Sequence, residues 1–280
     1  MAYTPVIPMS GYTGWKFVQS TYDRQFEAFT KSPDIERNIE YFRENIRDAQ
    51  EVGDLIQDRR LLTVALGAFG LDEDINKPAW VRKVLEEGTL KEGAFALRLN
   101  SKQYTDFANA FGYGNGGFDP TDKQIERIIE KYRVRAFEVA VGEVNNDMRL
   151  ALNFEREIGA IAEEGLSQTG GWFRVMGSEP LRQVVSTAFN LPSEFSQIDI
   201  DRQAEILADK AYQFFGSKTV DLFADPENVD KIIQRFQLMS QIQNGPSEQT
   251  PGYSALQILQ SGSVGLSSAG IANLLLSNSS

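Results

Sequence analysis

The sequence contains no cysteine and no histidine among its 280 residues. The first absence excludes disulfides, thiolate nucleophiles and thiolate metal sites. The second removes the commonest metal ligand and the side chain whose ordinary pKa lies nearest neutrality. A metal site would have to consist of oxygen ligands alone. We therefore expect no bound metal and no cofactor, and we assign no catalytic residue.

Basic residues are the minority among the charged ones, with 28 lysines and arginines against 39 acids and a formal net charge of −11. An acidic surface repels phosphate backbones, so the charge argues against nucleic acid as a partner. No apolar run approaches the roughly 20 residues that span a bilayer, and we expect no membrane insertion. The first eight residues lack the basic start and apolar core of a secretory signal, which predicts a cytoplasmic protein unless a dedicated machine exports it.

Two short motifs resemble ligand loops but lack parts that the chemistry requires. The glycine run 112–117 matches the spacing of a dinucleotide loop, but a predicted helix precedes it where that loop needs a strand. The acidic segment 72–76 opens like a calcium loop, but Lys77 and Lys83 occupy the positions that need glycine and a bidentate glutamate. We interpret the first as a linker and the second as a solvated loop.

Apolar residues recur every three or four positions along most of the chain, which is typical of amphipathic helices. The pattern predicts an all-α protein. In the first half we expect helices over 15–29, 33–46, 61–69, 80–85 and 104–111, while residues 95–99 fit either a short strand or a helical turn.

The same helical plan occurs twice. Residues 61–71 align with 181–191 at an offset of 120, and five apolar residues are identical, Phe69 and Phe189 among them. The offset grows steadily along the chain, as small loop insertions would make it; the matching pairs are Phe26 with Phe137, Phe42 with Phe154, Leu85 with Leu207 and Phe111 with Phe236. The sequence therefore predicts two pseudo-repeated helical modules that pack together.

The second copy opens with helical periodicity over about forty residues. Thr121 and Gln124 have the spacing of a capping box at its start. Because no Ser-Pro break interrupts this segment, we expect its two helices to be fused or nearly so, with Gly142 as the bend. Further helices are predicted over 181–189, 206–215 and 226–236.

These patterns divide the chain into an extended lead-in (1–14), helical module 1 (15–112), helical module 2 (118–239) and a polar tail (240–280) rich in serine, glycine and glutamine. The tail carries no basic residue, and Glu248 is its only acid. Its apolar clusters leave two alternatives open: a disordered tail, or segments that dock on the protein or on a partner.

A few large apolar residues are candidate partner contacts. Trp15 lies beside the lead-in and Trp172 and Phe173 follow a glycine pair, although helical spacing also fits Trp15 as core and the pair as a packed corner. The tail contributes four leucines, namely Leu256, Leu259, Leu274 and Leu275.

Carboxylates offer the main route to an enzyme without histidine. Glu36, Glu40 and Glu44 share one helix face, but Arg43 and its neighbouring arginines predict ordinary surface ion pairs there. An enzyme that uses carboxylates in a cleft between the modules is our alternative hypothesis. A third hypothesis is an acidic regulator that masks a basic partner.

Two blocks resemble an alphaproteobacterial domain family of unknown function whose genes often lie among flagellar genes. They are Ser10 to Thr21 (SGYTGWKFVQST) and Asp58 to Leu71 (DRRLLTVALGAFGL). The resemblance implies a helical fold and a flagellar connection. The protein would then stay in the cytoplasm or be exported by a flagellar-type machine. The resemblance implies no catalytic residues. Our main hypothesis is a non-enzymatic structural or protein-interaction factor linked to the bacterial flagellum, with protein partners.

Overall fold

The computed structural model describes residues 3–99 and 101–244, and all the regular structure in these ranges is helical. This confirms the all-α class. The α-helices are α1 (Gly11–Thr30), α2 (Pro33–Asn45), α3 (Val52–Gln57), α4 (Arg59–Gly67), α5 (Pro78–Glu87), α6 (Phe95–Arg98), α7 (Lys102–Phe111), α8 (Asp122–Val144), α9 (Asn146–Glu163), α10 (Gln168–Met176), α11 (Glu179–Ala188), α12 (Ile200–Phe215) and α13 (Pro226–Asn244). Short 3₁₀ turns are η1 (Ile46–Asp48), η2 (Asp72–Asn76), η3 (Tyr113–Asn115), η4 (Ser193–Gln197) and η5 (Val220–Ala224). Within the described ranges, no helix is long and apolar enough to cross a bilayer.

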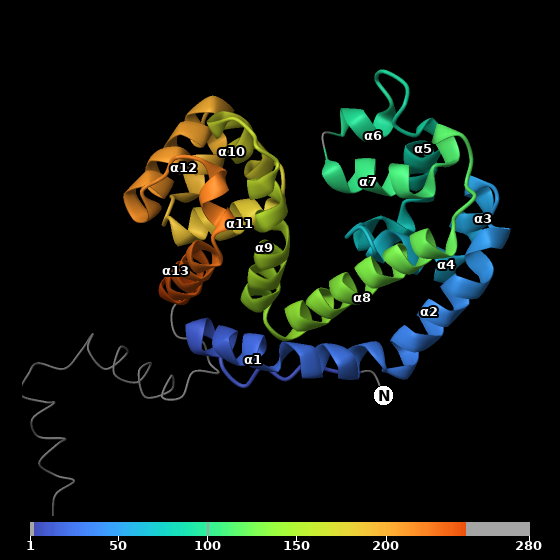
Figure 1. Cartoon of the computed structure of the whole chain (residues 1–280), viewed down its shortest axis with the longest axis horizontal. Helices are drawn as coiled ribbons and strands as arrows, with labels where there is room; N and C mark the ends of the chain where they lie inside the picture. Colours follow the sequence, from blue (N-terminus) through green and yellow to red (C-terminus); the bar gives the residue numbers. More distant parts are fainter. Residues whose placement is uncertain (1–2, 100, 245–280) are drawn as a thin grey trace, which may run out of the picture.

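The helices form two lobes (Figure 1). Lobe A contains α2 to α7, and lobe B contains α9 to α13. The long helix α8 runs obliquely from lobe A toward the base of lobe B, where α9 begins, and α1 lies along the base of the molecule. The lobes are thus joined twice, through α8 and through the corner between α1 and α2.

Each lobe has its own hydrophobic core, and the two cores exchange helices across the expected module boundary. Trp15 and Val18 of α1 are buried in the core of lobe B, although the helix precedes lobe A in sequence. Ile125 and Ile129, in the first half of α8, are buried in the core of lobe A, whereas Phe137 belongs to the core of lobe B. The division into modules at 15–112 and 118–239 stays a prediction, and the packing interlocks its two parts.

Ion pairs strengthen this interlock between α2 and α8. The prediction that arginines of the second helix pair with the glutamates of their own face is wrong. Arg43 donates to both oxygens of Glu126, at 2.6 and 3.0 Å, and Arg47 pairs with Asp122. Both acids lie on α8. Arg37 pairs locally, with Asp34.

The long periodic segment 121–161 is divided into α8 and α9 at Asn145, and the bend is not at Gly142. Asn145 is extended (φ −154°, ψ 109°), and its side chain accepts a hydrogen bond from the backbone N–H of Met148 as the N-cap of α9. Gly142 instead lies against the Arg149 side chain. A Cβ added at Gly142 would come within 2.5 Å of that side chain. The predicted capping box of Thr121 and Gln124 is present at the start of α8.

The ends of α4 and α11 share one local geometry at the offset of 120. In each, a backbone N–H bonds five residues back, from Leu71 to Leu66 and from Leu191 to Ser186. The residue before each donor is left-handed: Gly70 has φ 69° and Asn190 has φ 52°. The pseudo-repeat as a whole stays a prediction, but these termini have the same structure.

Replacement of Asn190 by alanine is expected to destabilise the protein by about 1 kcal/mol, because a Cβ without a local polar group disfavours the left-handed region. Replacement by glycine, which matches Gly70, should leave the free energy of unfolding within about 0.5 kcal/mol of the parent. Urea unfolding of the two variants measures the difference. Equal losses in both would contradict a backbone origin.

Candidate functional site

The predicted contact residues Trp15 and Trp172 are not surface residues. Both side chains are fully buried in the core of lobe B. Trp172 lies within α10, not at a corner between helices, and donates its indole N–H to the carbonyl oxygen of Lys218 at 2.8 Å. The prediction of these two as partner contacts is therefore corrected, because neither offers area to another molecule. Phe173 is half-buried against the same core.

The four tail leucines, Leu256, Leu259, Leu274 and Leu275, lie outside the described residues. Their role as contacts stays a prediction.

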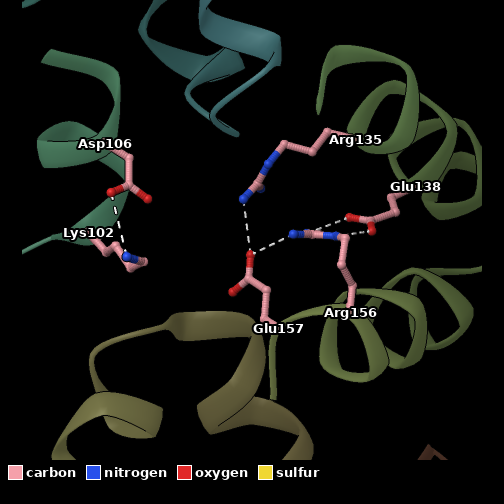
Figure 2. A network of polar contacts seen from close by, with 6 residues as sticks. All are labelled: Lys102, Asp106, Arg135, Glu138, Arg156 and Glu157. Atoms are coloured by element: carbon pink, nitrogen blue, oxygen red, sulfur yellow. Dashed lines mark hydrogen bonds and ion pairs between the residues drawn. The ribbon is translucent and has the colours of Figure 1, made fainter. Parts of the chain in front are cut away.

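The strongest polar cluster lies where α8 and α9 diverge between the lobes (Figure 2). Arg135 and Glu138 come from α8, and Arg156 and Glu157 come from α9. Arg135 and Glu138, three residues apart, share one face of α8. Arg156 and Glu157 meet them from α9. We call these four residues the junction network.

The junction network is a continuous chain of charge-assisted hydrogen bonds. Arg156 donates through Nε to one oxygen of Glu138 at 2.6 Å and through a terminal nitrogen to the other at 3.0 Å. Its second terminal nitrogen donates to Glu157 at 3.1 Å. Arg135 donates to the same Glu157 oxygen at 3.0 Å. A bidentate arginine–carboxylate pair fixes orientation as well as distance, so the network sets the angle between α8 and α9.

Arg135 also reaches lobe A. A Cβ added to Gly70 would come within 2.5 Å of its guanidinium, so this side chain lies against the carboxyl end of α4. Cations are favoured at that end of a helix because the carbonyl groups there are unpaired. Arg135 therefore links α4 of lobe A with Glu157 of lobe B.

Burial shapes the electrostatics of the junction. It lowers the pKa of Arg135, and the neighbouring Arg156 lowers it further. For Arg156 burial also acts to lower the pKa, but the hydrogen bonds and charge of Glu138 outweigh it and the pKa is raised. Burial lowers the pKa of the nearby Lys131, whose ammonium lies 4.8 Å from the centre of the Phe69 ring.

The junction brings carboxylates together, but arginines already engage them. Both oxygens of Glu138 accept from Arg156, and one oxygen of Glu157 accepts from two arginines. Such an arrangement holds helices in place; a general acid or nucleophile instead needs a carboxyl group that faces substrate. On α7, opposite the network, Lys102 pairs with Asp106 at 3.5 Å (Figure 2).

Sequence reasoning missed the junction network. Phe137 aligned with Phe26 as part of the repeat, but nothing in one sequence indicates that Arg156 faces Glu138, the neighbour of Phe137. The available signal was local: Asn145 begins a helix, and a hairpin there would place residues on either side of it opposite each other.

Two surface depressions lie away from the junction network. One of about 300 Å³ is lined by Gln183, Ser186 and Thr187 of α11, by η4 and by Gln243 of α13. A second of about 320 Å³ lies beside α3 and is lined in part by Glu51, Arg82 and Glu86. In residues 3–99 and 101–244, no group of three or more acidic side chains is arranged to hold a metal ion.

Large apolar side chains that the sequence analysis did not single out are exposed at the surface. Leu238 and Ile242 of α13 are 44% and 70% exposed, and Leu90, in the turn after α5, is 76% exposed. Solvated apolar side chains of this size are common as single residues, but two on one helix face form a patch.

The class that the fold defines is a two-lobed, all-helical protein with interlocked cores. A family model described as "Protein of unknown function (DUF1217)" matches residues 68–229, and the chain belongs to this family.

A crystal structure of a protein from Agrobacterium tumefaciens is similar over 86% of this chain and 100% of that one, with a TM-score of 0.69 and 30% identity. That organism fits the alphaproteobacterial resemblance of the two sequence blocks. No curated protein matches the chain.

Proposed function

We propose that the protein is a non-enzymatic structural or protein-interaction factor linked to the bacterial flagellum. The junction network carries the first part of the proposal, because its arginine–glutamate bonds hold the interlobe angle and thereby the shape of the surface. The flagellar part rests on the resemblance of the two sequence blocks, and its setting is the cytoplasm or a flagellar export route.

The partner proposal is tested by co-purification of the tagged full-length protein from motile cells after in vivo cross-linking. The expected result is enrichment of flagellar components, which disappears in a strain that makes no flagella. Normal swimming of a strain that lacks the gene, together with no enriched flagellar component, would contradict the proposal.

The non-enzymatic part is tested by complementation of that deletion strain with Glu157→Gln. The amide preserves size and one acceptor oxygen but removes the charge that a carboxylate enzyme would need. We expect Glu157→Gln to restore the phenotype as well as the matched control Glu163→Gln, which changes an exposed residue of the same helix. If Glu157→Gln folds normally but does not complement, while Arg135→Gln, which removes an arginine of the junction network and keeps the Glu157 carboxylate, does complement, the result would favour the carboxylate enzyme.

A further inference from the structure

The solvent-exposed face of α13 carries an apolar strip at its centre. Buried residues of this helix, Ile232, Ile233 and Phe236 among them, define the side that packs on lobe B. At 100° per residue, Leu238 and Ile242 point almost opposite to that side, where an amphipathic helix normally places charged residues. The two are one turn apart, so their side chains are neighbours. We call Leu238 and Ile242 the α13 strip.

Two cationic residues precede the α13 strip along the helix. Lys231 lies on the same face, and Arg235, one turn before Leu238, has its guanidinium 3.7 Å from the centre of the Phe214 ring. Phe214 is itself 41% exposed and stacks on Phe189 at 5.8 Å. The exposed apolar surface therefore continues past Arg235 onto α12. The patch suits an apolar segment without basic residues.

The chain supplies such a segment directly after α13. Residues 245–280 contain no lysine or arginine, and Glu248 is their only acid. Two apolar clusters occur there, Leu256 to Leu259 and Ile271 to Leu276. In both, leucine or isoleucine recurs at a spacing of three residues.

The distances allow this segment to fold back onto the helix that precedes it. About 12 residues separate Asn244 from Leu256 and span up to roughly 40 Å when extended. The strip lies only about 9 Å back along the helix axis, at 1.5 Å per residue. A short tether gives an effective concentration on the order of millimolar, which exceeds what a free partner reaches at ordinary protein concentrations.

We infer that the α13 strip is a docking site for the chain's own segment 256–259. Leu256 and Leu259 cover Leu238 and Ile242, and the docked segment lies across the outer face of lobe B. The inference concerns the isolated protein and does not depend on the proposed flagellar function.

Paramagnetic relaxation in the full-length chain tests this docking. The protein has no cysteine, so Lys231→Cys gives a single attachment site for a nitroxide on the exposed face beside the strip. We expect the amide resonances of residues 254–260 to lose more than half of their intensity in ¹⁵N-labelled protein that carries the label. The double change Leu238→Gln and Ile242→Gln in the same chain should restore them, whereas Leu90→Gln, the same kind of change at an exposed leucine of lobe A, should not.

A mixed sample distinguishes docking within one chain from docking between two chains. Nitroxide-labelled protein without ¹⁵N is combined with ¹⁵N-labelled protein without nitroxide, and the inference predicts full intensity for residues 254–260 in the latter. Attenuation of residues 254–260 in this mixture would assign the strip to a second copy; in an equal mixture it would reach about half of that in the single-chain sample, because half of the ¹⁵N-labelled chains would meet a partner without nitroxide. No attenuation in either sample, or attenuation that persists in the strip variant, would equally overturn the inference.

Discussion

Trp15→Ala is expected to destabilise the protein by about 4 kcal/mol, the cost of removing a large aromatic side chain from a packed core. Trp15 is fully buried between α1 and the core of lobe B. For a body of this size, the loss lowers Tm by roughly 10 °C. Urea unfolding and calorimetry measure both quantities. A stability within 1 kcal/mol of the parent, combined with loss of a binding partner, would return Trp15 to the surface role that its sequence position suggested.

Phenylalanine substitutions are the matched controls for this effect. The indole N–H of Trp15 is buried without a hydrogen-bond acceptor among the described residues, whereas that of Trp172 donates to the carbonyl oxygen of Lys218. Trp15→Phe therefore breaks no hydrogen bond, and Trp172→Phe breaks one and leaves an acceptor unsatisfied. We expect Trp172→Phe to cost about 1 kcal/mol more than Trp15→Phe.

Arg156→Ala is expected to cost about 3 kcal/mol, because it leaves the carboxylate of Glu138 without a cation in a nearly buried site. The Glu138 side chain is 7% exposed and that of Arg156 is 29% exposed, which places the effect at the lower end for broken buried pairs. Denaturant unfolding in low salt provides the measurement.

Arg37→Ala is the comparison for the junction network. Arg37 and its partner Asp34 are both more than half exposed, so the loss should stay below about 1 kcal/mol. The double variant Glu138→Gln and Arg156→Met should recover most of the stability that Arg156→Ala loses, because no unpaired charge is left buried. If the double variant were as unstable as Arg156→Ala, packing and not charge would explain the loss.

The sequence was sufficient to predict most of the helices, but it did not predict α3 or α10. Periodic apolar residues and caps such as Thr121 with Gln124 act within one or two turns, so they can be read without tertiary structure. The α-helical class and the buried helix around Leu61 to Phe69 followed from them, and the structure has α4 there. Residues 95–99, which fitted either a strand or a helical turn, form the short helix α6.

The contacts between helices could not be predicted in this way. Arg43 had acids on its own helix face, but it pairs with Glu126 across the interface with α8, and only the packing of α2 on α8 decides that choice. The sequence analysis predicted the bend at Gly142, but the helices divide at Asn145. Asparagine is a common N-cap residue, but no proline followed it to mark a helix boundary. The sequence also could not show that α1 packs in the core of lobe B or that α8 contributes to both cores. An apolar stripe shows that one face of a helix is buried, but not which helices cover it.

The two lobes interlock through α1 and α8 and are therefore expected to unfold together. The chain has three tryptophans, Trp80 in lobe A and Trp15 and Trp172 in the core of lobe B, so incorporation of 5-fluorotryptophan gives one ¹⁹F resonance for each. In a urea titration followed by ¹⁹F NMR, the account predicts that all three native resonances disappear with one midpoint. Loss of the Trp80 resonance at a midpoint distinct from that of Trp15 and Trp172 would contradict it, because it would show that lobe A unfolds without lobe B.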